Sequence, residues 1–226
     1  MTTSANGLST QELERKLNFL QGLPSSAYFS PPTHAFHSLG VLPFDSTPYA
    51  DLYSCSENLR ALCCIVNTQP ASQPGEHWVA FYRAAHAFHI EYFDSYGRPP
   101  EKYGFRTSIS SAPDPHGLKT IYSNFPLQGY GSNVCGHYCL LFIYFRRKLN
   151  SLTSTINLLC SLGRNPAARD QKVKQLYSSI RIHKLPQALL TPPQYPYACS
   201  SADSSIPTLN LNLSQSSSPN PLMHID

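Results

Sequence analysis

The 226-residue sequence has few charged residues: Asp, Glu, Lys and Arg make up 13% of the chain, and the formal net charge is +4. Residues 200–226 contain no Lys or Arg, so the basic excess lies in the first 190 residues. This mild balance permits contact with a polyanion without requiring it. No apolar run approaches membrane-spanning length, and residues 1–10 are polar, so we expect neither a membrane segment nor a secretion signal.

The seven cysteines form no C-x-x-C pair, and their number is odd. This usage predicts neither a disulfide framework nor a zinc ribbon. Cys135, His137 and Cys139 stand two residues apart, but such positions on a helix point in different directions. We therefore expect no metal, and an intracellular, reducing environment.

The length of the chain predicts one domain, in residues 1–190, followed by a tail. Ser9 and Glu12 form a capping box before leucines at helical spacing, which predicts a helix over 10–21. We expect a loop over 29–48 that wraps the core, strands at 39–42, 61–66, 78–82, 88–93 and 118–125, and helices at 154–162 and 166–180. Residues 191–226 are rich in Pro, Ser and Asn without periodicity, which predicts a disordered tail.

The most informative stretch is Gln128–Leu149. It begins with loop residues and becomes apolar at Val134, and residues 140–145 are apolar on every side, as in a buried helix. The last turn carries Arg146, Arg147 and Lys148, which suit the negative end of the helix dipole and which we interpret as a solvated helix end. Cys135 thus lies at the N-terminus of a central helix, where free backbone N–H groups favour the thiolate.

Two further residues stand at strand ends upstream of this helix. His77 precedes the strand 78–82, and Asp94 follows the strand 88–93. An antiparallel hairpin would bring both to one end of the sheet, where the packed helix presents Cys135. Each residue alone has an ordinary explanation: an exposed loop histidine, a strand-ending Asp, or a cysteine that only packs. Their order and spacing together favour a nucleophile, a base and an orienting acid.

This set of residues predicts acyl transfer. His77 would take the thiol proton of Cys135, and Asp94 would fix the imidazole tautomer through the other ring nitrogen. The tetrahedral oxyanion needs hydrogen-bond donors placed in advance. The candidates are the backbone N–H of Cys135 and the side-chain amide of Gln128, because the glycines between them would let the loop fold back.

Three segments resemble the adenovirus-type cysteine endopeptidases and the related proteases of Polinton (Maverick) DNA transposons. They are P-G-E-H-W-V-A-F-Y (74–82), Y-F-D-S-Y-G-R-P-P (92–100) and Q-G-Y-G-S-N-V-C-G-H-Y-C-L-L-F (128–142), with a weaker match over 36–45. The resemblance spans roughly residues 13–184. It implies an α+β fold with a central helix packed on a mixed sheet, and a cysteine endopeptidase that processes capsid or precursor proteins of a virus-like mobile element.

The resemblance also implies roles for individual residues. His77, Asp94 and Cys135 would form the triad, Gln128 would complete the oxyanion hole, and Trp78 would shield the histidine. Adenovirus enzymes typically carry Glu as the third member, whereas Asp94 matches the Polinton type and the ubiquitin-like-protein-specific proteases.

A second departure concerns activation. Adenovirus enzymes carry a cysteine, upstream of the glutamine, that joins an activating peptide, but this chain has none between Cys64 and Cys135. The resemblance keeps a peptide activator or DNA open as a cofactor, and we expect neither to be required. We expect a protein or peptide substrate, a monomer, weak DNA contact at most, and a location in the host nucleus or a virus-like particle.

Two other functions fit the same residues. A deconjugating protease for a ubiquitin-like modifier shares the fold and the triad, although little chain precedes the core in which to build a modifier-binding surface. A catalytically silent scaffold bound to capsid or DNA has no chemical need for the triad and the glutamine together.

Overall fold

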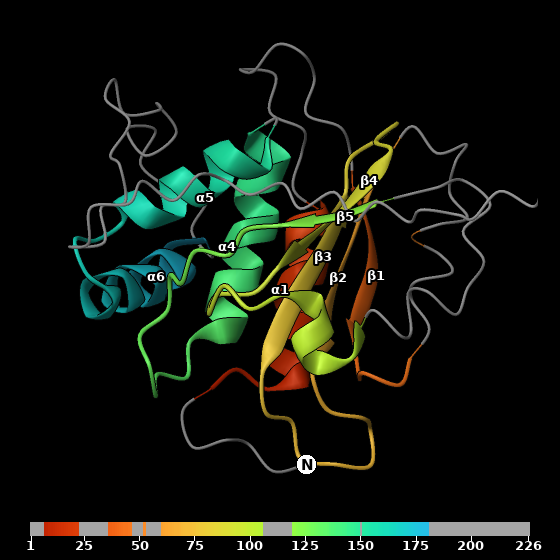
Figure 1. The fold of residues 1–226 in the computed structure, drawn as a ribbon, viewed down its shortest axis with the longest axis horizontal. Coiled ribbons are helices and arrows are strands. Elements are labelled where there is room, and N and C mark those ends of the chain that lie inside the picture. Colours follow the sequence, from red (N-terminus) through yellow and green to blue (C-terminus); the bar gives the residue numbers. More distant parts are fainter. Residues whose placement is uncertain are drawn as a thin grey trace, which may run out of the picture.

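The computed structural model describes residues 7–22, 36–46, 52, 60–105, 119–149 and 151–180, so the tail expected over 191–226 lies outside the described residues. The elements follow in the order α1 (Thr10–Gly22), β1 (Phe36–Leu42), β2 (Ala61–Asn67), β3 (Trp78–Arg83), β4 (His89–Phe93), η1 (Pro100–Tyr103), β5 (Lys119–Tyr122), α4 (Cys135–Lys148), α5 (Leu152–Ser161) and α6 (Pro166–Ile180). They form an α+β fold in which α4 lies between the sheet and the pair α5 and α6 (Figure 1).

The five strands form one mixed sheet in the order β1-β2-β3-β4-β5. β2, β3 and β4 pair antiparallel, and the two edge strands pair parallel with their neighbours. The hairpin of β3 and β4 has Ala80 opposite Phe93. The start of β3 and the end of β4 therefore lie at the same end of the sheet, as the sequence predicted.

Strand β2 has every residue buried because the sheet is covered on both faces. Cys63 and Ile65 point to the face that carries α1 and α4, and Cys64 and Val66 point to a second apolar cluster on the opposite face. Since side chains alternate along a strand, a strand covered on both faces is apolar throughout. The short apolar run at 61–66 was therefore correctly predicted as a buried strand.

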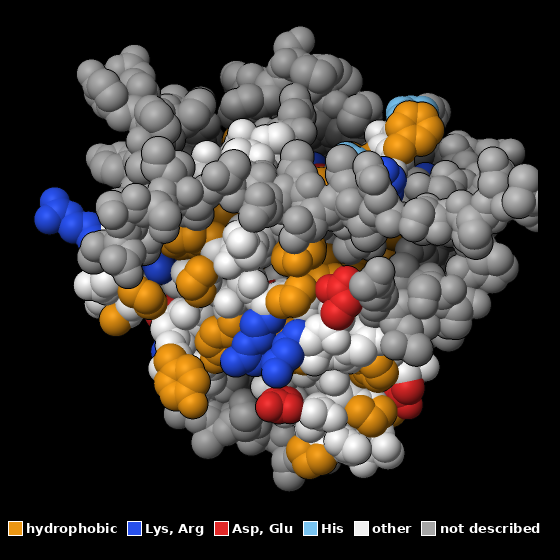
Figure 2. Space-filling model, viewed as in Figure 1, with side chains coloured by type: hydrophobic (Ala, Val, Ile, Leu, Met, Phe, Trp, Pro, Cys, Tyr) orange, Lys and Arg blue, Asp and Glu red, His pale blue; other side chains and the backbone are white. Residues whose placement is uncertain are grey.

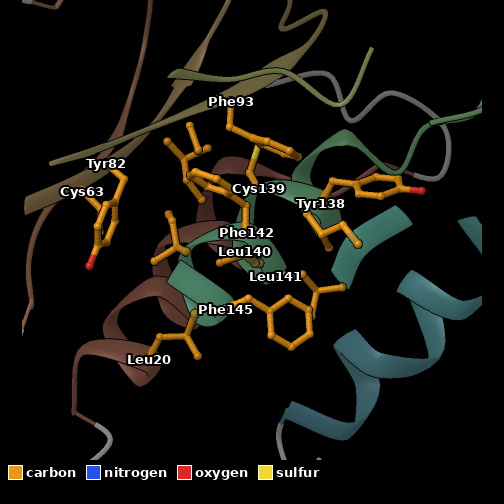
Figure 3. Packing of buried hydrophobic residues seen from close by; sticks show 14 of the residues in the cluster. Leu20, Cys63, Tyr82, Phe93, Tyr138, Cys139, Leu140, Leu141, Phe142 and Phe145 are labelled. Carbon is orange, nitrogen blue, oxygen red and sulfur yellow. The ribbon is translucent and has the colours of Figure 1, made fainter. Parts of the chain in front are cut away.

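Helix α4 is the centre of the core. Figure 3 shows its side chains enclosed by the sheet and by α1. Phe142 stacks on Phe93 of β4, with ring centroids 4.4 Å apart and planes 7° from parallel. Burying one side chain of this size stabilises the fold by about 1.5–3 kcal/mol. The first residue of α4, Cys135, is thereby held in a fixed place relative to β3 and β4.

Helix α1 begins at the predicted capping box. The Ser9 hydroxyl accepts from the backbone N–H of Glu12 (3.3 Å), and the Glu12 carboxylate accepts from the backbone N–H of Ser9 (3.0 Å). The Ser9 hydroxyl also donates to this carboxylate (2.9 Å), and the hydrogen bonds from the Ser9 N–H and O–H lower the pKa of Glu12. Leu13, Leu17 and Leu20 are buried, so the predicted apolar face of this helix is confirmed.

The end of α4 contradicts the expectation of a solvated helix end. Arg146 and Arg147 are buried. Arg146 forms a bidentate ion pair with Glu91 on β4, at 2.5 and 2.7 Å, and Arg147 donates to the carbonyl of Leu20 in α1 (2.8 Å). The cations thus anchor the helix end to the sheet and to α1.

Two strand predictions also need correction. The strand expected at 88–93 begins at His89, and the side chain of Phe88 is 85% exposed. Glu91, in the middle of this strand, is buried and is covered by Arg146. Strand β1 extends over Phe36–Leu42, whereas only 39–42 was expected to be a strand within a wrapping loop. Its parallel pairing with β2 leaves no mark in its own sequence.

The surface carries charge of both signs. On the face drawn in Figure 2, some of the described Lys and Arg side chains form a small central group, with Asp, Glu and apolar side chains close by, and others lie at the left edge and at the upper right. Within the described ranges, no helix is both long and apolar enough to cross a membrane.

Candidate active site

His77 and Asp94 meet at the end of the β3–β4 hairpin. His77 directly precedes β3, and Asp94 directly follows β4. The Nε2 atom of His77 lies 2.7 Å from Oδ1 of Asp94, and both side chains are buried. The hairpin register accounts for the contact, because it places the two strand ends side by side.

The Asp94 carboxylate is held by three further donors. Oδ1 also accepts from the backbone N–H of Tyr96 (2.8 Å), while Oδ2 accepts from the backbone N–H of Arg98 and from the Tyr103 hydroxyl (3.2 Å each). Gly97 makes the turn possible: its φ is +69°, and a Cβ there would lie 2.6 Å from the Asn124 carbonyl oxygen. The D-S-Y-G sequence thus fixes the carboxylate in one orientation.

The His77 imidazole is stabilised in its protonated form. Burial by itself would lower the pKa of His77, but hydrogen bonding to Asp94 and to the Cys135 thiol outweighs it and raises the pKa to about 9. Because Nε2 faces Asp94, Nδ1 is the ring nitrogen available to the thiol. Carboxylate, imidazole and thiol therefore lie in sequence, as general-base activation of a nucleophile requires.

Cys135 is the first residue of α4 and is buried. The preceding Val134 gives the helix no side-chain cap, so the first backbone N–H groups remain directed at the site. Cys139, one turn later, is fully buried, and its Sγ donates to the Trp78 carbonyl (3.3 Å). His137 instead packs its ring on Tyr177 of α6, at 4.6 Å. His137 thus points away from Cys135 and Cys139, as expected of positions two apart on a helix.

The chemistry of the cysteines follows their burial. Cys63, Cys64, Cys135 and Cys139 are free thiols, and burial raises the pKa of Cys139 well above the usual value. A fifth cysteine, Cys160, is disulfide-bonded, which the cysteine spacing did not indicate. Within the part of the chain that the structure describes, no three His, Cys, Asp or Glu side chains form a group suited to a metal ion.

The side-chain amide of Gln128 is buried in a hydrogen-bond network. Its Oε1 accepts from the Ser95 hydroxyl (2.6 Å), and its Nε2 donates to the Tyr96 hydroxyl (3.1 Å) and to the Ser132 carbonyl (2.6 Å). Both amide N–H groups therefore already have acceptors inside the protein. Gln128 can donate to a substrate oxygen only when one of these acceptors moves away.

A groove of about 1130 Å³ opens above these residues. It runs between the segment before α1, the β2–β3 loop, the loop after β4 and the residues before α4, and both His77 and Cys135 line it. Trp78 also lines it, with its indole Nε1 donating to the Leu8 carbonyl (3.2 Å) and its ring edge against Gly136. Trp78 thus joins the groove wall to the segment before α1.

Two tyrosines missed in the sequence cover the imidazole. The rings of Tyr96 and Tyr103 lie 4.9 and 5.7 Å from the His77 ring, centroid to centroid. Among the described residues, these are the ring contacts of His77, whereas the resemblance implied Trp78 as the shielding residue. The sequence could have indicated Tyr96 as a neighbour of His77, since Tyr96 lies two residues after Asp94 in the Y-F-D-S-Y-G segment.

The chain is similar to known proteases. It is 28% identical to the protease of bovine adenovirus B serotype 3, over 65% of this chain and 83% of that protein. No protein-family model matches it.

Solved structures also align with the chain. The pS273R protease of ASFV aligns with a TM-score of 0.41 and 22% identity, over 64% of this chain and 59% of the protease chain. ChlaDub1 from Chlamydia trachomatis aligns with a TM-score of 0.40 and 15% identity, over 81% of this chain and 80% of that chain.

Proposed function

We propose that this chain is a cysteine endopeptidase of the adenovirus type that hydrolyses peptide bonds through Cys135, His77 and Asp94. The observation that carries the proposal is the buried His77–Asp94 pair, together with the placement of His77 and of Cys135, the first residue of α4, on one groove. The similarity to the bovine adenovirus protease supports the same assignment.

The proposed reaction begins with proton transfer. The Cys135 thiol gives its proton to Nδ1 of His77, and the resulting thiolate attacks the carbonyl carbon of the scissile peptide bond. The carbonyl π electrons move to oxygen, which gives a tetrahedral oxyanion. Asp94 stabilises the imidazolium that forms and keeps the ring oriented.

Collapse of the oxyanion completes the first half of the reaction. The C–N bond breaks, the imidazolium of His77 gives its proton to the leaving amine, and an acyl-thioester on Cys135 remains. Water then loses a proton to His77 and attacks the thioester. The second tetrahedral species expels the Cys135 thiolate and releases the carboxylic acid, which restores the free protein.

The test is cleavage profiling on a diverse peptide library by mass spectrometry. We expect cuts within peptides by the wild-type protein and none by Cys135→Ala or His77→Ala, both folded by circular dichroism. Cys64→Ala is the matched control, because Cys64 is a buried thiol on the opposite face of the sheet. Cleavage retained in a verified Cys135→Ala sample would contradict the proposal.

Alkylation by iodoacetamide tests the nucleophile without a substrate. A thiolate paired with imidazolium reacts fast at pH 6, where ordinary thiols are protonated. We expect Cys135 to react at least about tenfold faster than a free cysteine at that pH, because a larger fraction of it would be thiolate. An equal rate would favour a catalytically silent scaffold.

The substrate class within this proposal rests on the sequence resemblance. We propose precursor or capsid proteins of a virus-like mobile element, cleaved in the host nucleus or particle without an obligatory cofactor. Adding DNA or an activating peptide to the cleavage assay tests the last point. A fluorogenic ubiquitin-like modifier substrate distinguishes deconjugation, because an endopeptidase acting within precursors leaves it uncut.

A further inference from the structure

Two side-chain donors converge on one oxygen of the loop that leads to Cys135. The carbonyl oxygen of Ser132 accepts from Nε2 of Gln128 at 2.6 Å and from the hydroxyl of Tyr96 at 3.1 Å. The same two donor groups lie 3.1 Å from each other. Ser132 stands three residues before the nucleophile in the loop that leads into α4.

This arrangement has the geometry of an oxyanion hole with an internal occupant. Such a hole consists of fixed donors, about 2.7–3.1 Å from one oxygen, beside the attacking atom. We propose that the Tyr96 hydroxyl is a further catalytic residue, which donates with Gln128 to the oxyanion, and that the Ser132 carbonyl occupies its place in the free protein. The inference rests on the proposed function, since the oxyanion arises from attack by Cys135.

Tyr96 is held in place from several directions. Its backbone N–H binds Oδ1 of Asp94, its ring lies 4.9 Å from that of His77, and the Arg98 guanidinium lies 4.9 Å from the centre of its ring. A donor fixed in this way needs no reorganisation when charge develops. Tyr96 thereby connects the base side of the site to the oxyanion side.

The Tyr96 hydroxyl also remains a donor over a wide pH range. Burial raises the pKa of Tyr96, and the neighbouring Cys135 raises it further, so the phenol stays protonated. Tyr96 lines the groove together with Cys135, which places it within reach of a bound substrate.

The loop before α4 has room for the Ser132 carbonyl to turn away. Gly131 has a φ of +74°, and no atom lies within 4 Å of the position a Cβ would take there. The neighbouring Tyr130 is fully exposed, and the buried Ser132 hydroxyl has no partner among the described residues. Rotation of the peptide between Ser132 and Asn133 would remove the carbonyl and free both side-chain donors.

The test is Tyr96→Phe, which removes the hydroxyl and keeps the ring. Loss of one oxyanion-hole donor lowers kcat by about 10²- to 10³-fold. We expect a fall of that order in kcat with KM nearly unchanged. The affinity for a peptide aldehyde, built on the best peptide found by cleavage profiling, should fall in parallel, because the aldehyde forms a tetrahedral adduct with Cys135.

Iodoacetamide separates this role from a structural one. Alkylation of Cys135 displaces iodide and creates no oxyanion, so Tyr96→Phe should react at the wild-type rate. Tyr144→Phe on α4 is the matched control, since Tyr144 lies outside the groove lining, and it should leave all three readouts unchanged. Thermal unfolding of each variant verifies the fold.

Three results would overturn the role of Tyr96. Unchanged kcat and aldehyde affinity in an otherwise active Tyr96→Phe protein remove the role while leaving the proposed function intact. Slower alkylation in parallel with slower cleavage indicates that the hydroxyl only holds the site together. A wild-type protein that neither cleaves peptides nor binds the aldehyde removes the proposed function, and this role with it.

Discussion

Nε2 of His77 lies 2.7 Å from Oδ1 of Asp94, and the Asp94 side chain is fully buried. The pair makes folding dependent on pH. The folded protein holds the His77 proton up to a pKa of about 9, against an ordinary value of 6.5. Between these pH values the folded state binds more protons than the unfolded state, so the contribution of His77 is complete below pH 6.5 and is lost as the pH rises through 9.

The first prediction concerns Asp94→Asn, which removes the charge and keeps the size. Burial then dominates, and the pKa of His77 should fall below 6.5. The wild-type free energy of unfolding should decline by about 3 kcal/mol between pH 6.5 and 9, and the variant should lack this decline. Peptide cleavage should fall by roughly 10²- to 10⁴-fold. NMR titration of the histidine ring and urea unfolding across this range provide the measurements.

His86→Asn is the control for this titration, because His86 is exposed and its φ of +58° suits Asn. It should keep the wild-type decline in stability. A His77 resonance that titrates identically in the wild-type and Asp94→Asn proteins would show that the carboxylate does not control the imidazole.

The second prediction concerns the ion pair of Arg146 and Glu91. Both side chains are about 3% exposed, and the guanidinium also lies 4.8 Å from the Tyr82 ring centre. Removing one partner leaves a buried charge unpaired, so Arg146→Ala should lower the free energy of unfolding by about 3–5 kcal/mol. Arg146→Lys should lower it less, because an ammonium keeps the charge but cannot make the bidentate contact. Urea unfolding at pH 7 measures both.

The double variant Glu91→Gln/Arg146→Met tests whether the cost arises from the unpaired charge. It should be less destabilised than the sum of its single variants, since neither charge remains buried alone. Burial would raise the pKa of Glu91, but hydrogen bonds from His89 and Arg146 outweigh it and lower that pKa. The pair therefore contributes above pH 4.5 and weakens as the pH falls through the lowered pKa. Additive losses would mean that the two side chains act independently.

Local patterns were sufficient for the parts of the fold that depend on local chemistry. The capping box at Ser9, the apolar run at 61–66 and the change at Val134 each correspond to an element boundary or a buried strand in the structure. The meeting of His77 and Asp94 was also predictable, because an antiparallel hairpin places the start of its first strand beside the end of its second strand.

Contacts between distant segments were not predictable in the same way. Arg146 pairs with Glu91, which lies 55 positions earlier in the sequence, and Arg147 donates to the carbonyl of Leu20, which lies 127 positions earlier. Their position in a last helical turn indicated a solvated end, because sequence spacing carries no information on which element packs there. The sequence likewise did not reveal that the Ser132 carbonyl accepts a hydrogen bond from the side-chain amide of Gln128.

The third prediction concerns His137, whose buried Nδ1 has no hydrogen-bond partner among the described residues. Burial, and then the charge of Lys174, lower the pKa of His137 to about 4, and they outweigh the charge of Glu12, which raises it. A base with a lowered pKa is neutral in the folded protein and protonated in the unfolded chain between pH 6.5 and 4. Stability should therefore fall as the pH decreases across this interval, by about 3 kcal/mol in total.

His137→Leu should remove this part of the acid sensitivity, because it replaces the imidazole with an apolar side chain against the Tyr177 ring. Urea unfolding at several pH values from 7 to 4 gives the two slopes. The wild-type slope should be the steeper one, and parallel slopes would show that His137 is protonated equally in the folded and unfolded states. Cleavage by His137→Leu at pH 7 should match the wild type, since the imidazole packs on α6 and lies outside the groove lining.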